Sequence, residues 1–143
     1  MVAKLLRAMQ RVVVADDNPA MTAALKVVLQ IWGWDVLVAH DGTTAVEAIR
    51  ASRPALALID IGLPDLDGLE VARVLRAVGA VPSLMVALSG YGEERDLLAS
   101  RQAGFDRHLV KPVDPELLRR TIMPVASQGR GRRDDTARPR PRP

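Results

Sequence analysis

The chain alternates short runs rich in apolar residues with stretches in which apolar residues recur at helical spacing. The short runs predict five strands, over 12–15, 36–39, 56–59, 84–88 and 107–110. The stretches after them predict five helices, from 19 to a stop at Gly33, from 43 through 49, and over about 68–78, 95–103 and 115–123. Continuously apolar strands separated by helices are typical of parallel sheets with both faces covered. We therefore expect an α/β fold with one parallel sheet between two helix layers.

Capping residues support these helix boundaries. Asn18 and Pro19 supply a cap and a first-turn proline for the first helix, and Asp114 and Pro115 repeat that pair before the last one. Pro124 has no backbone N–H, and its ring clashes with the preceding turn, so we expect the last helix to end near residue 123. A helix this short would offer partners a smaller surface.

Polar side chains stand where four of the predicted strands end. They are Asp16 and Asp17 after the first strand, Asp60 after the third, Ser89 after the fourth and Lys111 after the fifth. The carboxyl ends of parallel strands form one edge of the sheet, and ligands bind at that edge. We therefore expect these groups to share one site.

Three carboxylates at one site offer the oxygen ligands that Mg²⁺ prefers. Without a cation they would repel one another, so the cluster is either metal-bound or offset by Lys111. A carboxylate that ends a buried strand, as Asp60 does, is costly unless a partner or water meets it. The structural alternative for Asp17 is help in capping the first helix. For Asp65 and Asp67 we expect loop solvation or capping of the third helix.

Ser89 and Lys111 also have structural alternatives, because Ser89 precedes a glycine at a turn and single lysines are common in loops. Beside a metal-bound carboxylate, however, a hydroxyl and an amine form the set that neutralises the oxygens of a transferred phosphoryl group. Lys111 precedes Pro112, and an X–Pro bond is where a cis peptide is accessible. Such a bond would direct the amine back over the strand ends.

With 143 residues, 48% of them hydrophobic, the chain fits one globular domain. No apolar run is long enough to span a membrane, and the start lacks the features of a signal peptide, so we expect a cytoplasmic protein. The absence of cysteine excludes disulfide bonds and thiolate metal sites.

The net charge of +3 resides in the C-terminal tail, where residues 127–143 carry six arginines against two aspartates. Few apolar residues and an alternating Arg–Pro end predict disorder there. The tail has no aromatic residue to stack on bases, so we expect weak nucleic-acid binding at most. We thus divide the chain into a short N-terminal extension (1–10), a folded domain (11–126) and a disordered basic tail (127–143).

The polar residues and their contexts resemble the receiver (CheY-like) domain of two-component response regulators. The resemblance covers about residues 11–123 and rests on Asp16-Asp17, on LIDIGLPDLDG around Asp60, on ALSGYG and on GFDRHLVKPVD. The last two phrases are also similar to receivers of hybrid histidine kinases. The fold that this resemblance implies is flavodoxin-like, a (βα)5 doubly wound sheet with strand order 2-1-3-4-5.

The resemblance also implies a role for each residue of the site. Asp60 would accept a phosphoryl group in a Mg²⁺-dependent step, and Ser89 and Lys111 would hold the phosphoryl oxygens. The implied magnesium ligands are Asp17, Asp60 and the backbone carbonyl of Gly62, with Asp16 acting mostly through a metal-bound water. The Lys111–Pro112 bond would be cis.

The implied switch involves residues around this centre. Gly62 and Tyr91, each two residues after a site residue, would tune the lifetime of the acyl phosphate. The added charge would draw Ser89 inward and rearrange the face formed by the fourth helix, fifth strand and fifth helix. The chain departs from the family at His108, where Tyr or Phe is common. Whether His108 couples to the hydroxyl or is only a half-buried strand residue stays open.

No helix-turn-helix segment follows the domain, so we expect a single-domain receiver. It would be phosphorylated by a histidine kinase or a histidine phosphotransfer protein and would act on a downstream protein target. A phosphohydrolase would need further acid–base groups, so we do not expect an enzyme. The alternatives are a phosphate sink or relay receiver detached from a hybrid kinase, and a constitutive interaction module with a polyanion-binding tail.

Overall fold

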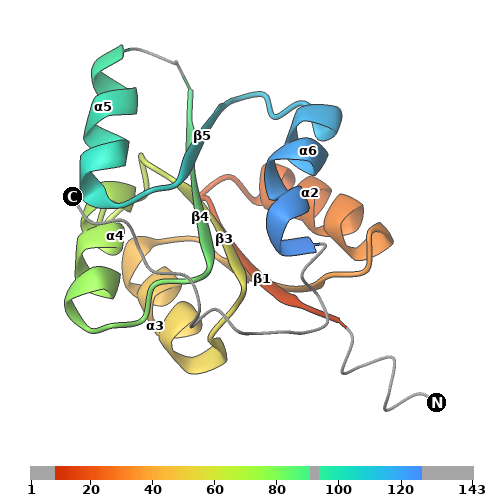
Figure 1. The fold of residues 1–143 in the computed structure, drawn as a ribbon, viewed down its shortest axis with the longest axis horizontal. Coiled ribbons are helices and arrows are strands. Elements are labelled where there is room, and N and C mark those ends of the chain that lie inside the picture. The colour runs from red at the N-terminus through yellow and green to blue at the C-terminus, as the bar shows by residue number, and fades with distance from the viewer. Residues whose placement is uncertain (1–8, 91–93, 127–143) are drawn as a thin grey trace.

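The structure, a computed structural model, describes residues 9–90 and 94–126. Strands and helices alternate along these residues (Figure 1). The elements are β1 (Arg11–Ala15), α2 (Pro19–Ile31), β2 (Asp35–Ala39), α3 (Gly42–Ser52), β3 (Leu56–Asp60), α4 (Gly68–Ala77), β4 (Leu84–Ser89), α5 (Glu94–Ala103), β5 (Arg107–Val110) and α6 (Pro115–Ala126). All strand pairs are parallel, in the order β2-β1-β3-β4-β5. This topology confirms the expected flavodoxin-like fold.

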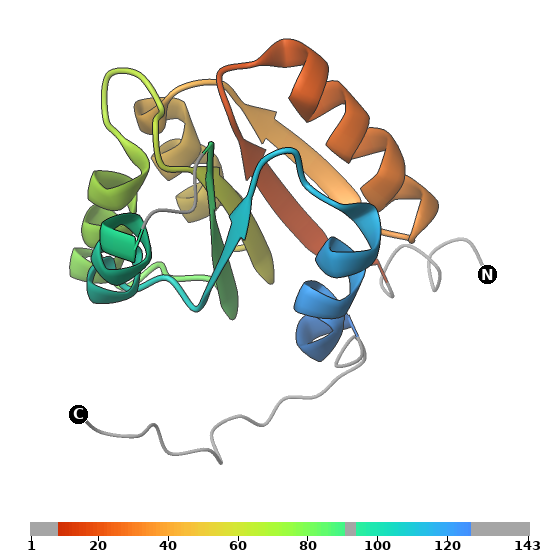
Figure 2. The same ribbon diagram turned by 90° about the horizontal axis from the view of Figure 1, so that it is seen from above.

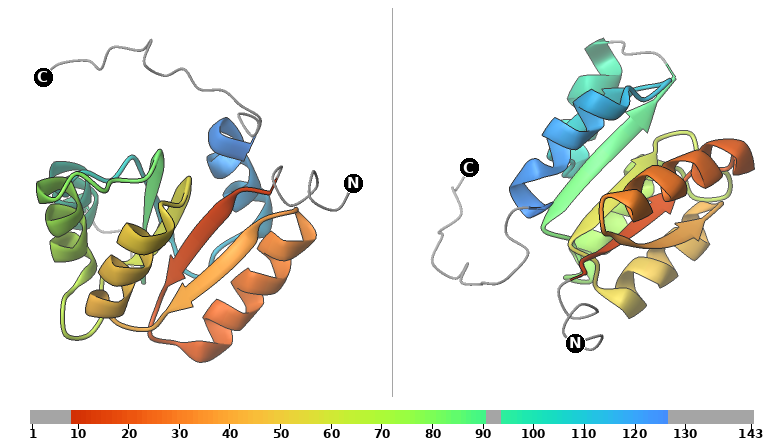
Figure 3. Two further views of the ribbon diagram at one scale, coloured as in Figure 1. Left: turned by 90° about the horizontal axis from the view of Figure 1, so that it is seen from below. Right: turned by 90° about the vertical axis from the view of Figure 1, so that its right-hand side faces the viewer.

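Helices cover both faces of the twisted sheet, as the views in Figures 2 and 3 show. α2 and α6 lie on one face, over a buried cluster that includes Val12, Leu29, Leu58 and Ile122. α3, α4 and α5 lie on the other face, over a cluster that includes Val13, Ile49, Ile59 and Leu75. Successive strand residues such as Val12 and Val13 therefore enter different clusters, which explains why the strands are continuously apolar.

Side-chain caps fix the starts of the helices. The Asn18 side chain accepts hydrogen bonds from the backbone amides of Ala20 and Met21 at 2.9 and 3.2 Å, which starts α2. Asp67 accepts a hydrogen bond from the Glu70 amide at 2.9 Å and caps α4, the third helix, so the capping role expected for Asp67 is confirmed. Caps of the same kind start α3 and α6, at Asp41 and Asp114. The carboxylates of these caps are committed to local backbone structure.

The last helix differs from its prediction. α6 continues through Pro124 to Ala126, so the expected end near residue 123, and with it the shortened surface, is wrong. Val125 is buried in the cluster beneath α2 and α6, and the Gln10 side-chain amide donates a hydrogen bond to the Val125 carbonyl. A proline inside a helix costs roughly 3 kcal/mol. Burial of one valine and one hydrogen bond together return about that amount. Tertiary packing thus extends a helix that the local sequence would end.

None of the helices in the described part of the chain is long and apolar enough to cross a membrane. Most of the expected N-terminal extension and the whole expected tail lie outside the described residues, as does Tyr91.

Candidate functional site

The strand register brings the predicted polar residues to one edge of the sheet. Ala15 of β1 pairs with Ile59 of β3, so the residues that follow them, Asp16 and Asp60, are neighbours. On the other side of β3, Asp60 pairs with Leu88 of β4. At the next strand, the Lys111 amide donates to the Ser89 carbonyl at 2.7 Å. Four strand ends therefore meet at the carboxyl edge, as the sequence predicts.

Carboxylates of Asp16, Asp17 and Asp60 converge at this edge. One oxygen from each lies within 4.8 Å of the others. Asp16 and Asp60 are buried, whereas Asp17 is exposed. Because like charges this close repel strongly where water is scarce, the arrangement requires a positive charge.

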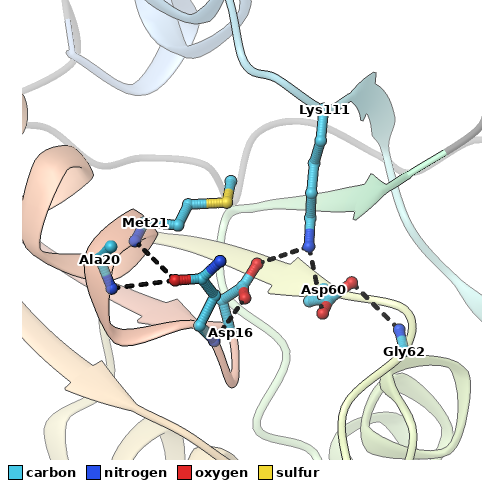
Figure 4. Close-up of polar contacts among 7 residues, drawn as sticks. Asp16, Ala20, Met21, Asp60, Gly62 and Lys111 are labelled. Carbon is cyan, nitrogen blue, oxygen red and sulfur yellow. Dashed lines mark hydrogen bonds and ion pairs between the residues drawn. The ribbon is translucent and has the colours of Figure 1, made fainter.

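Lys111 supplies one positive charge between Asp16 and Asp60 (Figure 4). Its Nζ lies 2.8 Å from Asp16 Oδ2 and 3.3 Å from Asp60 Oδ2. Asp16 Oδ2 is buried, and besides this ion pair no donor among the described residues reaches it. One ammonium group offsets only part of the charge of three carboxylates, so the site keeps a net attraction for cations.

Backbone amides hold the other oxygen of each buried carboxylate. The Asn18 amide donates to Asp16 Oδ1 at 2.9 Å, and the Gly62 amide donates to Asp60 Oδ1 at 3.1 Å. In both cases the donor lies two residues after the aspartate, so the turn itself orients the side chain. Each buried carboxylate therefore has one oxygen fixed by its own loop and one directed at Lys111 (Figure 4).

The environment changes the proton affinities of Asp60 and Lys111 in the same direction. Burial raises the pKa of Asp60, and the Asp16 charge adds to this, while the Gly62 amide and Lys111 oppose it. For Lys111, burial alone would lower the pKa, but the hydrogen bond to Asp16 and the charges of Asp60 and Asp16 outweigh burial and leave the pKa raised. Lys111 therefore keeps its charge more firmly, and the charged form of Asp60 is less favourable in the fold than in water.

The donor set fits Mg²⁺. All its side-chain atoms are carboxylate oxygens, the ligand type that this hard cation prefers, and one of the carboxylates is solvent-exposed at the opening. Buried Asp16 Oδ2 has a single polar contact among the described residues, which leaves a lone pair for a metal-bound water. The side chain that caps α2 is Asn18, which accepts from the amides of Ala20 and Met21, so the expected help of Asp17 in capping this helix is not seen among the hydrogen bonds of the described residues.

Ser89 contacts His108 in the structure. Ser89 Oγ lies 2.8 Å from His108 Nε2, and His108 Nδ1 lies 3.2 Å from Ser100 Oγ. His108 is a half-buried residue of β5, and it is also hydrogen-bonded to the Ser89 hydroxyl. The Lys111–Pro112 peptide bond is cis.

Sequence reasoning missed two residues next to the site. Ser100 is a buried helical serine, and nothing in the local sequence of α5 separates it from an exposed one. Gly68 begins α4, where a Cβ atom would lie 2.5 Å from the Asp60 carbonyl oxygen and 2.8 Å from Ile61 Cα. The sequence feature that could have revealed this role is a glycine at the start of a helix, because a residue without Cβ lets α4 approach the end of β3 closely.

Comparison with known proteins agrees with this geometry. The family model for the response regulator receiver domain matches residues 12–123. The DNA-binding response regulator MtrA of Mycolicibacterium smegmatis is 38% identical over 109 residues, which cover 76% of this chain and 47% of MtrA. The chain thus spans about half the length of the curated relatives it matches.

Solved structures give the same result. A CheY-like receiver domain protein from Methanospirillum hungatei JF-1 has a TM-score of 0.77 and 26% identity, covering 85% of this chain and 96% of that one. The receiver domain of a sensor histidine kinase from Pseudomonas aeruginosa PAO1, with a magnesium ion coordinated in its active-site cleft, has a TM-score of 0.74 and 27% identity, covering 83% and 98%. With its sheet order, acidic cluster and family match, the chain belongs to the response regulator receiver domain family.

Proposed function

We propose that Asp60 accepts a phosphoryl group from the phosphohistidine of a partner protein. A receiver domain is a signalling module, and its family implies a cognate histidine kinase. The observation that carries the proposal is the state of Asp60 itself: one oxygen is fixed by the Gly62 amide and the other is paired with Lys111 at the open edge of the sheet. In the transfer, an Asp60 oxygen attacks phosphorus, the P–N bond breaks, and its electron pair stays on the imidazole of the donor.

The proposed metal ligands are Asp17, Asp60 and the backbone carbonyl of Gly62, with Asp16 holding a metal-bound water. When bound, Mg²⁺ supplies charge neutralisation for the phosphoryl oxygens. Lys111 binds phosphoryl oxygen with the amine that now contacts Asp60, and Ser89 donates its hydroxyl to another oxygen. Asp16 keeps Lys111 at the site during this exchange, because its ion pair does not involve the reacting carboxylate.

The output surface in this proposal is formed by α5, β5 and α6, and β5 lies between the two helices in Figure 1. Each of these elements exposes an apolar side chain: Leu98, Val110 and Leu117 are 59%, 44% and 42% exposed. β5 is an edge strand of the sheet and leads directly into Lys111 of the site. A phosphoryl group on Asp60 would shift this face between two arrangements and change its affinity for a downstream protein.

Intact-mass spectrometry after incubation with acetyl phosphate tests the proposal. Wild-type protein should gain one phosphoryl mass in Mg²⁺ and none in EDTA, and Asp60→Asn should gain none. Asp65→Asn is the matched control, because Asp65 is an exposed loop aspartate with a φ of 65° that asparagine also adopts. Absence of the adduct in wild type, or its persistence in Asp60→Asn, would refute Asp60 as the acceptor.

A further inference from the structure

The imidazole of His108 lies between two hydroxyl groups that belong to different elements. Nε2 faces Ser89 of β4 at 2.8 Å, and Nδ1 faces Ser100 of α5 at 3.2 Å. Both serines are buried. His108 pairs in register with Ala87, two residues before Ser89, so its ring stands on the side of the sheet that Ser89 also faces. The ring therefore connects the hydroxyl at the site to the helix that covers it.

The positions of the protons on Ser100, His108 and Ser89 can be assigned from the hydrogen-bond acceptors around them. Ser100 Oγ lies 3.0 Å from the Leu97 carbonyl, which only accepts, so the single Ser100 proton is directed there. The Ser100 oxygen then accepts from Nδ1–H. A neutral imidazole with its proton on Nδ1 has only a lone pair at Nε2, and Ser89 must donate to it.

We infer that His108 is a positioning residue that restrains the Ser89 hydroxyl, with Ser100 fixing the imidazole in the tautomer that does so. The inference rests on the proposed phosphorylation of Asp60. A hydroxyl has one proton, so Ser89 cannot donate to a phosphoryl oxygen while it donates to Nε2. The Ser89–His108 hydrogen bond therefore opposes stabilisation of the phosphoryl group.

The same hydrogen bonds give the switch a path to α5. When Ser89 turns to the phosphoryl group, His108 loses its hydrogen bond to Ser89 and keeps its hydrogen bond to Ser100. The imidazole then keeps its hydrogen bond to Ser100 of α5, and α5 forms part of the proposed output face. A phenylalanine at this position would fill similar space but would offer no acceptor to Ser89.

Beryllofluoride, which adds to an aspartate oxygen as a phosphoryl stand-in, measures the restraint by titration calorimetry in saturating Mg²⁺. His108→Phe should bind beryllofluoride about three- to tenfold more tightly than wild type. This ratio corresponds to the net free energy of the Ser89–His108 hydrogen bond, which no longer has to be broken. His108→Gln keeps an acceptor and should stay near wild type. Ser100→Ala should give an intermediate gain. Its control is Ser52→Ala on α3, another helical serine that donates to a backbone carbonyl, at 2.7 Å, and should change nothing.

A double-mutant cycle separates this role from a general effect on packing. In a Ser89→Ala background, His108→Phe should no longer change beryllofluoride affinity, because the restrained group is gone. A gain that persists in that background, or an unchanged affinity in His108→Phe alone, would overturn the inference. Failure of the wild type to bind beryllofluoride would instead refute the proposed function of Asp60.

A measurement on the wild type covers the case in which the His108 variants do not fold. Nitrogen-15 NMR of the neutral imidazole should show a proton on Nδ1 and none on Nε2. The reverse tautomer would overturn the inference, since Ser89 would then accept the hydrogen bond and keep its proton for the phosphoryl group.

Discussion

Lys111 lies closer to Asp16 than to the carboxylate proposed to react, with Nζ 2.8 Å from Asp16 Oδ2 and 3.3 Å from Asp60 Oδ2. Asp16 is fully buried, and its other oxygen is held by the Asn18 amide. The shorter ion pair therefore ties β5 to the end of β1 independently of the chemistry at Asp60. Asp16 thus has a structural role in placing the amine besides its proposed part in metal binding.

Lys111→Met should destabilise the metal-free protein by roughly 1–3 kcal/mol, because it leaves buried carboxylates without a counter-charge. Urea unfolding at pH 7 in EDTA measures this loss, and saturating Mg²⁺ should recover most of it. Lys26→Met, at an exposed position on α2, is the control and should stay within about 0.5 kcal/mol of wild type. An equal loss in EDTA and in Mg²⁺ would show that the amine does not offset the metal-binding charges.

Asp60→Asn should stabilise the metal-free protein by a few degrees at neutral pH. Burial raises the pKa of Asp60 above its ordinary 3.8, so the folded state binds this proton more tightly than the unfolded chain does. The resulting stability is present in acid and is lost as pH rises from the unfolded value through the raised folded value. Melting temperatures of both proteins in EDTA should therefore diverge as pH increases over this window. A variant less stable than wild type at pH 7 would contradict the electrostatic account.

Gly68→Ala should cost roughly 1–3 kcal/mol and weaken Mg²⁺ binding, because a Cβ there would lie 2.5 Å from the Asp60 carbonyl oxygen. Gly62→Ala is the contrast on the same loop, since its Cβ would meet Asp60 Oδ1 at an ordinary 3.8 Å. That variant should stay within about 0.5 kcal/mol of wild type. Equal effects of the two substitutions in chemical unfolding and Mg²⁺ calorimetry would disprove a steric role for Gly68.

Pro124→Ala should stabilise the fold by up to about 3 kcal/mol, because it restores a helical N–H and removes the ring from the turn. The buried contact of Val125 should be unchanged by this substitution. Thermal unfolding of the variant measures the gain. A loss of stability would show that Pro124 itself stabilises the end of α6, contrary to the cost expected for a proline inside a helix.

Much of the fold and the placement of the acidic cluster could be predicted from the sequence. Parallel strands must end on one edge, so runs that end in Asp16, Asp60 and Lys111 place these groups together whatever the details of packing. Capping at Asn18 is equally local, because the cap bonds span two and three residues.

The remaining features depend on contacts between distant elements. The end of α6 is set by Val125 and Gln10, which lie 115 residues apart in the chain. The Ser100–His108 contact forms only once α5 covers β5, and a serine on a helix carries no local mark of such a partner. Local propensity could not predict either feature, since tertiary packing decides both.

The central claim is that the phosphoryl group is carried by Asp60, and chemical trapping locates it directly. Protein phosphorylated with acetyl phosphate in Mg²⁺ is reduced with borohydride, which converts an aspartyl phosphate to homoserine, and is then digested and sequenced by mass spectrometry. The account predicts homoserine at position 60 alone, with Asp16, Asp17, Asp65 and Asp67 unmodified. Homoserine at one of those positions, or none at position 60 in protein that has gained the phosphoryl mass, would contradict it.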